Sequence, residues 1–128
     1  MIILDTDILI EIFDKRSERG DKALENILGS GDIIGITAIS LHEILYGVQK
    51  YAKPVREILQ LPVLGYTKED ANLSARIELE AEKTGAPIRR TDAMIAAIAI
   101  NNRASLYTLD LKHFKPLQSY GLKLFPSL

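Results

Sequence analysis

Short runs of apolar residues alternate along this chain with longer segments in which apolar residues recur every three or four positions. The short runs are typical of buried β-strands, and the longer segments are typical of helices with one apolar face. The predicted strands are residues 2–4, 33–36, 63–66, 106–108 and 122–125. The predicted helices are residues 8–13, 23–28, 40–50, 55–61, 67–85 and 92–102. Strands separated by helices indicate the α/β class, and we expect a three-layer α/β/α sandwich with a mainly parallel sheet.

Several of the predicted helices begin with residues that suit a helix N-terminus. Ser40 and Glu43 fit the S-x-x-E capping box, so we expect Ser40 to cap the third helix. Pro54 suits the first turn of the helix that follows. Thr67 and Thr91 have the hydroxyl side chain that is favoured at the N-cap, and we expect them to start the last two predicted helices.

The composition favours one compact domain over residues 1–128. Hydrophobic residues make up 47% of the 128 residues, which is enough to build a core without covalent staples. The chain has no Cys, so disulfide scaffolds and thiolate zinc sites are excluded. Only two His are present, which argues against an imidazole-rich metal site.

Neither a membrane segment nor a broad nucleic-acid-binding surface is expected. The longest apolar run, 93–100, is far shorter than the ~20 residues that span a bilayer. The apolar start of the chain meets an acid at position 5 and lacks the basic region of a signal peptide, so we expect a cytoplasmic protein. The net charge of −1 argues against general coating of nucleic acids but leaves room for local basic patches.

Four acids stand at the ends of predicted elements. Asp5 follows the first strand, Asp110 follows the 106–108 strand, and Glu43 and Asp92 lie at the starts of helices. Because ligands of open parallel sheets bind beyond the carboxyl ends of the strands, we expect these acids to face one rim. Converging carboxylates repel one another unless a hard cation neutralises them, and oxygen ligands suit Mg²⁺ or Mn²⁺. The chemistry that such a site serves best is phosphodiester hydrolysis.

Each acid also has a purely structural interpretation. Asp5 could cap the following helix, and Glu43 could be the capping-box partner of Ser40. Asp92 could complement a helix dipole, and Asp110 could be an ordinary turn residue. It is the joint placement of the four acids that favours a functional site.

Four segments of the chain resemble the PIN-domain family, and within it the small VapC-like toxin ribonucleases of toxin–antitoxin operons. They are residues 2–10 (IILDTDILI), 40–48 (SLHEILYGV), 91–99 (TDAMIAAIA) and 106–114 (LYTLDLKHF). The resemblance covers nearly the whole chain, in the order and spacing of the family. It implies that Asp5, Glu43, Asp92 and Asp110 bind Mg²⁺, with Mn²⁺ as a substitute, and catalyse endoribonucleolytic cleavage of RNA.

The resemblance also implies supporting residues and partners. Thr6 and Thr108 match polar positions beside the acids, and Thr108 is expected to orient a carboxylate or a water molecule. Asp7 is a fifth acid, which we interpret as a dipole partner of the first helix. A homodimer or higher homo-oligomer and a small antitoxin protein that covers the active site are the expected protein partners.

Basic residues flank the last two acids and could hold RNA phosphates. They are Arg89, Arg90, Lys112 and Lys115. A solvated surface position is the alternative for each of them. Tyr46 could stack on a base, although packing is the simpler interpretation, and His42 is expected on a helix surface or at a subunit contact.

Two other classes of function remain open on the sequence alone. Asp5 and Asp7 after a hydrophobic strand resemble the D-x-D motif of phosphatases that use an aspartate nucleophile, but Leu9 and the isolated Asp110 depart from that pattern. A PIN scaffold that binds RNA or a protein without cleaving RNA is the other alternative. The loss of an acid would mark such a scaffold, and no acid is missing here.

Overall fold

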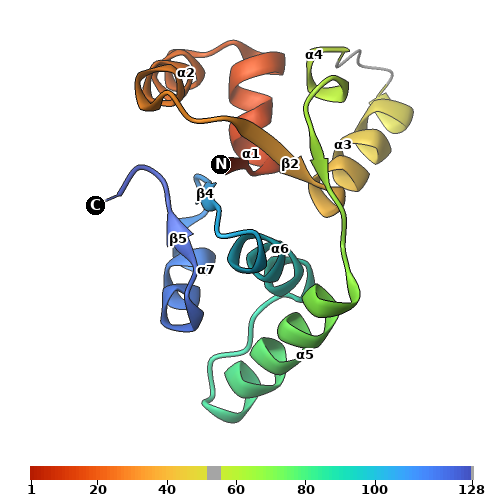
Figure 1. Cartoon of the computed structure of the whole chain (residues 1–128). Helices are drawn as coiled ribbons and strands as arrows, with labels where there is room; N and C mark the ends of the chain where they lie inside the picture. Colours follow the sequence, from red (N-terminus) through yellow and green to blue (C-terminus); the bar gives the residue numbers. More distant parts are fainter. Residues whose placement is uncertain (52–55, 128) are drawn as a thin grey trace.

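A five-stranded parallel sheet forms the centre of the molecule. The structure is a computed structural model that describes residues 1–51 and 56–127. The strands are β1 (Ile2–Leu4), β2 (Ile34–Thr37), β3 (Val63–Leu64), β4 (Ser105–Tyr107) and β5 (Lys123–Leu124). They lie in the order β3-β2-β1-β4-β5, and each neighbouring pair is parallel (Figure 1). All five predicted strands are therefore present, β1 with the predicted bounds and the others with ends displaced by at most two residues.

Helices connect the strands and cover both faces of the sheet. In chain order they are α1 (Thr6–Leu9), the π-helical turn η1 (Ile10–Lys15), α2 (Glu18–Ser30), α3 (Ala38–Tyr51), α4 (Arg56–Leu59), α5 (Lys68–Lys83), α6 (Arg90–Asn101), α7 (Leu111–Phe114) and the 3₁₀ turn η2 (Lys115–Tyr120). The predicted position of Pro54 lies outside the described residues. The short elements α7 and η2 were not predicted from the sequence.

Alternation of side chains along β1 divides the core into two halves. Ile3 packs in one apolar cluster with residues of α5, α6, α7 and η2. Ile2 and Leu4 pack in the other cluster, with residues of α1, η1, α2, α3 and α4. Figure 1 shows these two groups of helices on opposite sides of the sheet. The predicted three-layer α/β/α sandwich is thus confirmed.

Two of the predicted helix caps are wrong. Helix α3 begins at Ala38, and the N–H of Ser40 donates to Oγ1 of Thr37 at 3.1 Å, so Thr37 at the end of β2 provides the cap. Helix α6 begins at Arg90, which places Thr91 inside its first turn, and the preceding residue makes no side-chain cap. By contrast, Thr67 caps α5 in a reciprocal capping box with Asp70, as expected for that helix start.

The segment after α1 does not continue as a regular α-helix to residue 13. It widens into η1, which ends where Arg16 takes a left-handed conformation with φ of 49°. The Oγ of Ser17 then accepts the N–H of Gly20 at 3.0 Å and starts α2 earlier than predicted. Gly31, with φ of 68°, ends α2.

The sheet order places the end of β1 at the centre of the carboxyl edge. Asp5 directly follows β1, and Thr108 directly follows the neighbouring strand β4. This edge, where loops leave parallel strands, is where ligands bind in open α/β sheets. Within the described part of the chain, no helix combines the length and the apolar character needed to cross a lipid bilayer.

Candidate active site: a carboxylate-lined pocket

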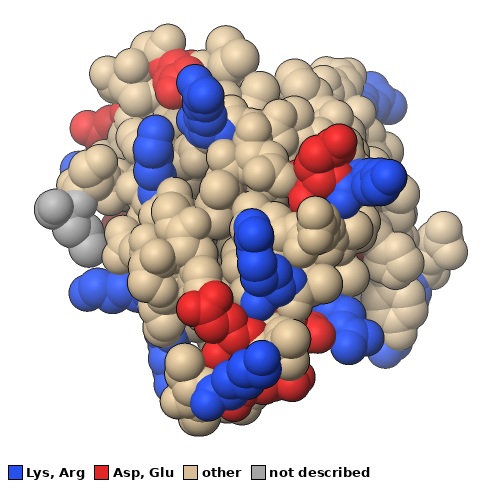
Figure 2. All heavy atoms as spheres, turned by 60° about the horizontal axis from the view of Figure 1, so that its bottom comes forward, with Lys and Arg blue, Asp and Glu red and all other residues tan. Residues whose placement is uncertain are grey.

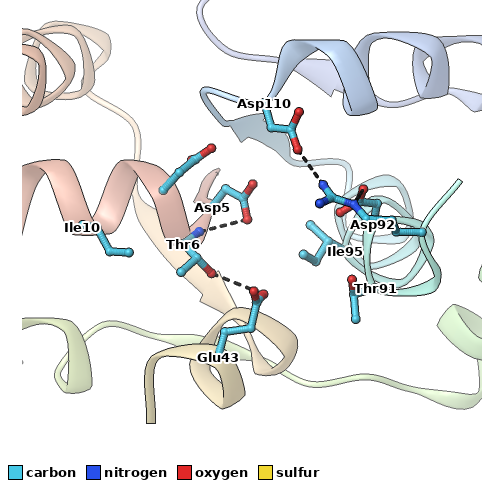
Figure 3. A pocket seen from close by; sticks show the side chains of 10 residues that line it. Asp5, Thr6, Ile10, Glu43, Thr91, Asp92, Ile95 and Asp110 are labelled. Atoms are coloured by element: carbon cyan, nitrogen blue, oxygen red, sulfur yellow. Dashed lines mark hydrogen bonds and ion pairs between the residues drawn. The ribbon is translucent and has the colours of Figure 1, made fainter. Parts of the chain in front are cut away.

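Asp5 is a buried acid at the centre of the carboxyl edge, directly after β1. Its side chain is only 7% exposed, and it caps α1, where Oδ1 accepts the N–H of Thr6 at 2.9 Å. Its other oxygen, Oδ2, accepts the hydroxyl of Thr108 at 2.8 Å. The helix-cap role therefore applies to Asp5 as well, and it leaves the carboxylate facing the pocket (Figure 3).

The ionised form of Asp5 is disfavoured, because its hydrogen bonds do not offset the cost of burying the charge. Burial and the neighbouring charge of Asp7 raise the pKa of Asp5 to about 7, from its usual 3.8. Hydrogen bonds from Thr108 and Thr6 act in the opposite direction but do not outweigh burial. A cation in the pocket would therefore stabilise the ionised carboxylate strongly.

Asp7 joins the first helix to the loop that follows β4. Its Oδ2 accepts the N–H of Leu109 at 3.1 Å and the hydroxyl of Thr108 at 3.3 Å, while Oδ1 accepts its neighbour's N–H. Burial also raises the pKa of Asp7. Asp7 lies in the first turn of α1, as the dipole interpretation predicts, and it also lines the pocket.

Glu43 reaches the pocket from α3. Because Thr37 caps that helix, Glu43 is not the capping-box partner of Ser40. Its Oε1 instead accepts the hydroxyl of Thr6 at 3.4 Å, which links α3 to α1 (Figure 3). Partial burial raises the pKa of Glu43, and the charge of Asp92 adds to the effect.

Asp92 and Asp110 lie on the other side of the pocket and share one basic partner. Nε of Arg89 lies 2.7 Å from Oδ2 of Asp92, and Nη2 of Arg89 lies 2.6 Å from Oδ2 of Asp110. Burial acts to raise the pKa of Asp110, but hydrogen bonds from His113 and Arg89 outweigh it and hold the pKa below its usual value. Asp110 also caps α7, so it is more than a turn residue.

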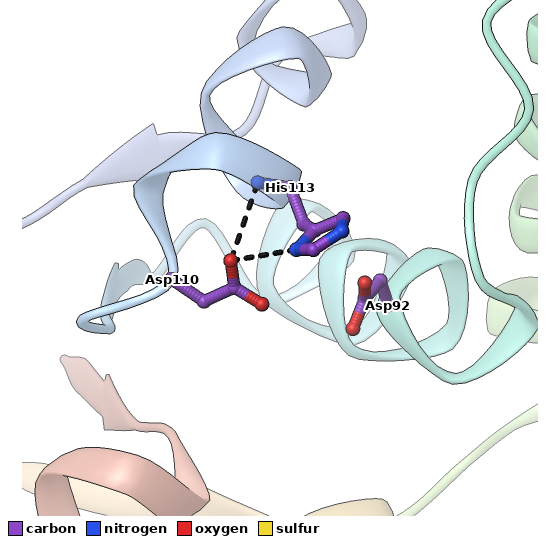
Figure 4. A group of neighbouring side chains, drawn as sticks. All are labelled: Asp92, Asp110 and His113. Carbon is purple, nitrogen blue, oxygen red and sulfur yellow. Dashed lines mark hydrogen bonds and ion pairs between the residues drawn. The ribbon is translucent and has the colours of Figure 1, made fainter.

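His113 lies beside two of the acids, although it is not among the site residues predicted from the sequence. Its Nδ1 lies 2.7 Å from Oδ1 of Asp110 (Figure 4). Possible ligand atoms of Asp92, Asp110 and His113 all lie within 4.8 Å of one another. The available signal was the spacing of three residues between Asp110 and His113, which brings both to one side of a short helix once the helix itself is known.

All the predicted acids face a single pocket of about 270 Å³. Its charged lining residues are five carboxylates, Asp5, Asp7, Glu43, Asp92 and Asp110, and one base, Arg89. The five carboxylates offer oxygen atoms, the ligands that Mg²⁺ and Mn²⁺ prefer, and burial raises the pKa of Asp5, Asp7 and Glu43. The residues therefore fit a hard divalent cation, and they would resist an anion without one.

Of the predicted RNA-binding residues, only Arg89 lines this pocket. Arg90 points elsewhere, with Nε and Nη2 at 3.0 and 3.2 Å from the two carboxylate oxygens of Glu78 on α5. Lys112 and Lys115 are exposed on α7 and η2. His42 is exposed on α3, and the exposed Tyr46 ring lies below Nζ of Lys50, 5.6 Å from its centroid.

Comparison with known proteins identifies the family of the chain. A sequence profile of the PIN domain matches residues 2–116. The chain therefore belongs to the PIN-domain family, as the motifs of the sequence indicate. Within that family it is similar to a Rickettsia felis protein named ribonuclease VapC2, with 31% identity over 94% of this chain and 95% of the relative. A Methanocaldococcus jannaschii protein named ribonuclease VapC1 is also 31% identical, over 97% of this chain and 86% of the relative.

Solved structures give the same result. A crystal structure described as VapBC2 from Rickettsia felis bound to a promoter DNA fragment matches with a TM-score of 0.80 and 28% identity, over 97% of both chains. A toxin–antitoxin complex from Klebsiella pneumoniae matches with a TM-score of 0.70 and 25% identity, over 89% of this chain and 90% of that chain. The PIN fold expected from the sequence is thus present over nearly the whole length.

Proposed function

We propose that this protein is a Mg²⁺-dependent endoribonuclease of the VapC type, with Mn²⁺ able to replace Mg²⁺. The observation that carries the proposal is the convergence of five carboxylates on one pocket, in which Arg89 is the single base among the described residues. Similarity to proteins named ribonuclease VapC supports RNA as the substrate. In this proposal Asp5, Glu43, Asp92 and Asp110 hold the metal and are the catalytic residues.

The reaction is hydrolysis of a phosphodiester bond. Water attacks phosphorus in line, the bond to the 3′-oxygen breaks, and the products carry a 5′-phosphate and a 3′-hydroxyl. A bound Mg²⁺ would polarise the phosphoryl oxygen and would lower the pKa of the attacking water. No protein nucleophile is needed, which is consistent with a chain without Cys.

The chain's own residues orient the carboxylates. Thr108 donates to Asp5 and Asp7, and its Oγ1 accepts the N–H of Asp110 at 3.0 Å, so one hydroxyl ties three acids to the end of β4. Thr6 holds Glu43 in the same way at the start of α1. These two residues therefore act as positioning residues, because pre-oriented ligands bind metal without reorganisation.

RNA would reach the pocket along local basic residues rather than across a broad basic surface. Figure 2 shows Lys and Arg interspersed with Asp and Glu on the face that it presents. We propose phosphate contacts from Arg89 at the pocket and from Arg90, Lys112 and Lys115 outside it. The salt dependence of RNA binding is then that of a few phosphate contacts.

We also propose an antitoxin protein as a partner and self-association into a homodimer. Solved relatives described as VapBC and as toxin–antitoxin complexes support the antitoxin. An RNA substrate together with such a partner would place the protein's action in the cytoplasm.

The proposal is tested by cleavage of RNA with purified wild-type, Asp5→Asn and Asp92→Asn proteins. Wild type should cleave in Mg²⁺ or Mn²⁺ and stop in excess EDTA, whereas both variants should lose at least 100-fold because a metal ligand is removed. Asp21→Asn on the exposed surface of α2 is the control and should keep full activity.

Mapping the RNA ends makes this test specific. New 5′-phosphates are expected, whereas contaminating metal-independent ribonucleases leave cyclic phosphates. Activity that persists in EDTA or in both variants would contradict the proposal. Binding of diverse RNAs without shortening would favour the non-cleaving scaffold, and a phosphorylated Asp5 would favour the phosphatase.

A further inference from the structure

Arg89 has an unusual position for a residue beside a cation site. It precedes α6, and its guanidinium bridges from Asp92 at the start of that helix to Asp110 after β4, at 2.7 and 2.6 Å. Among the described residues, no other Lys or Arg lines the pocket. The guanidinium thus neutralises one side of the pocket by itself.

Arg89 occupies one oxygen on each of two carboxylates that could hold a metal. It contacts Oδ2 of both Asp92 and Asp110, and their possible ligand atoms lie within 4.8 Å of each other. A guanidinium and a divalent ion cannot both take the same lone pairs at contact distance. Glu43 also lies within electrostatic range of Arg89, whose charge acts to lower the pKa of Glu43.

We propose that Arg89 is an internal competitor of the metal. In the metal-free protein it pairs with Oδ2 of Asp92 and Oδ2 of Asp110, and these two hydrogen bonds compete with coordination of a divalent ion by the same oxygens. This inference rests on the proposed function, since it assigns those two acids as metal ligands. The Arg89 side chain is 56% exposed, so solvent surrounds a path by which it can swing outward.

Displacement of Arg89 by the metal would couple metal binding to RNA binding. While Arg89 is paired, its donors are directed at carboxylates and do not face a phosphate. Once a metal takes the carboxylates, the guanidinium is released at the mouth of the same pocket. The contact of Arg89 with RNA therefore becomes available when the metal is bound.

The competition sets the direction and size of the expected effect. Removing Arg89 removes two charge-assisted hydrogen bonds that the metal must break and one positive charge that repels it. Because the guanidinium is half exposed, these terms are screened, and we expect a gain of about 5- to 10-fold in metal affinity.

The experiment is a calorimetric titration of the full chain with Mn²⁺ at fixed salt and pH. Arg89→Gln should bind Mn²⁺ about 5- to 10-fold more tightly than wild type. Arg90→Gln is the matched control, because Arg90 pairs with Glu78 and lies outside the pocket, and its Mn²⁺ affinity should equal that of wild type. Arg89→Lys keeps the charge but cannot bridge two carboxylates through a planar fork, so an intermediate affinity is expected.

A second measurement separates competition from a change in folding. In EDTA, Arg89→Gln should melt below Arg90→Gln, because the buried Asp92 loses its partner, and saturating Mn²⁺ should remove most of that difference. If Arg89→Gln does not fold, Arg89→Lys still has to bind Mn²⁺ more tightly than wild type. Equal or weaker binding in the folded variant overturns the inference alone. A lack of Mn²⁺ binding in every protein overturns the proposed function together with it.

Discussion

Asp5 is a buried carboxyl group whose pKa is raised although two hydrogen bonds favour its ionised form. Two donors, the N–H of Thr6 and the hydroxyl of Thr108, hold its oxygens, and both favour the ionised form. Even so, burial and the charge of Asp7 raise its pKa to about 7. The metal-free protein therefore keeps this carboxyl group protonated over a wider pH range than usual, and a bound cation would favour its ionised form.

This residue should make the metal-free protein less stable as the pH rises. The folded-state pKa of Asp5 is about 7, above the usual 3.8. The contribution of protonated Asp5 to the free energy of unfolding is therefore fully present below about pH 4 and is lost as the pH rises to about 7. Asp5→Asn should remove this pH dependence. At pH 8 in EDTA, its free energy of unfolding should exceed that of wild type by at least about 2 kcal/mol. Urea unfolding of both proteins between pH 4 and 8 measures the difference. A constant difference across this range would contradict the assignment.

At the residue scale, the alternation of apolar strands and helices predicted where the acids lie, but it did not predict which side chains contact them. A polar residue directly after an apolar strand must lie at the carboxyl edge, which located Asp5 correctly. The pattern could not tell whether Arg89 faces a phosphate or an acid, because the direction of its side chain depends on how α6 packs beside β4. The ion pair of Arg90 with Glu78 could not be predicted either, because α5 and α6 come together only in the folded molecule.

At the scale of elements, the close approach of α2 to η1 supports the helix that carries Thr6 and Asp7. A Cβ atom added to Gly20 would lie 2.1 Å from the carbonyl oxygen of Glu11, so only glycine permits this contact. The N–H of Ser17 donates to the same carbonyl at 3.2 Å. The two segments are thus joined backbone to backbone.

Gly20→Ala should therefore destabilise the protein by about 2–4 kcal/mol, because rigid backbone atoms have to move apart. Gly29→Ala in the last turn of the same helix is the matched control, with no atom within 4 Å of the added Cβ. It should be neutral or stabilising by up to about 1 kcal/mol, since alanine favours helix over glycine. Urea unfolding distinguishes the two. Similar effects from both substitutions would show that the close contact does not govern stability.

The elements were predicted well where a long periodic pattern was available and poorly where local chemistry decides. Helix α5 has sixteen residues of regular pattern and a true capping box, and its start was predicted correctly. At α3, two hydroxyl residues three positions apart, Thr37 and Ser40, both suit a cap, and the end of β2 decides between them. Helix α7 is only four residues long, too short to establish a period.

At the scale of the whole molecule, the site gathers side chains from segments far apart in the chain. Asp5 follows β1, Glu43 comes from α3, Asp92 from α6, and Asp110 from the start of α7. A bound ion would therefore connect the two groups of helices across the carboxyl edge of the sheet. Such a link stabilises the entire fold rather than one loop, because the unfolded chain cannot assemble it.

Metal binding should raise the unfolding temperature of the whole domain in one transition. At a Mn²⁺ concentration about 100 times the Kd, the expected stabilisation is about 2.7 kcal/mol, or several degrees in Tm for a domain of this size. Asp92→Asn should show a much smaller shift at the same concentration. Scanning calorimetry with and without Mn²⁺ measures this. An equal shift in the variant would place the ion elsewhere.

The order of the strands has one more consequence. Asp5, Asp7 and Glu43 precede the exposed Gly65, whereas Asp92 and Asp110 follow it, and the two stretches meet through the pairing of β1 with β4. A polypeptide divided at Gly65 would thus yield two pieces, each with an incomplete set of carboxylates. If the two pieces were fused to proteins whose association can be induced, the proposed nuclease would be inactive until the pieces associate.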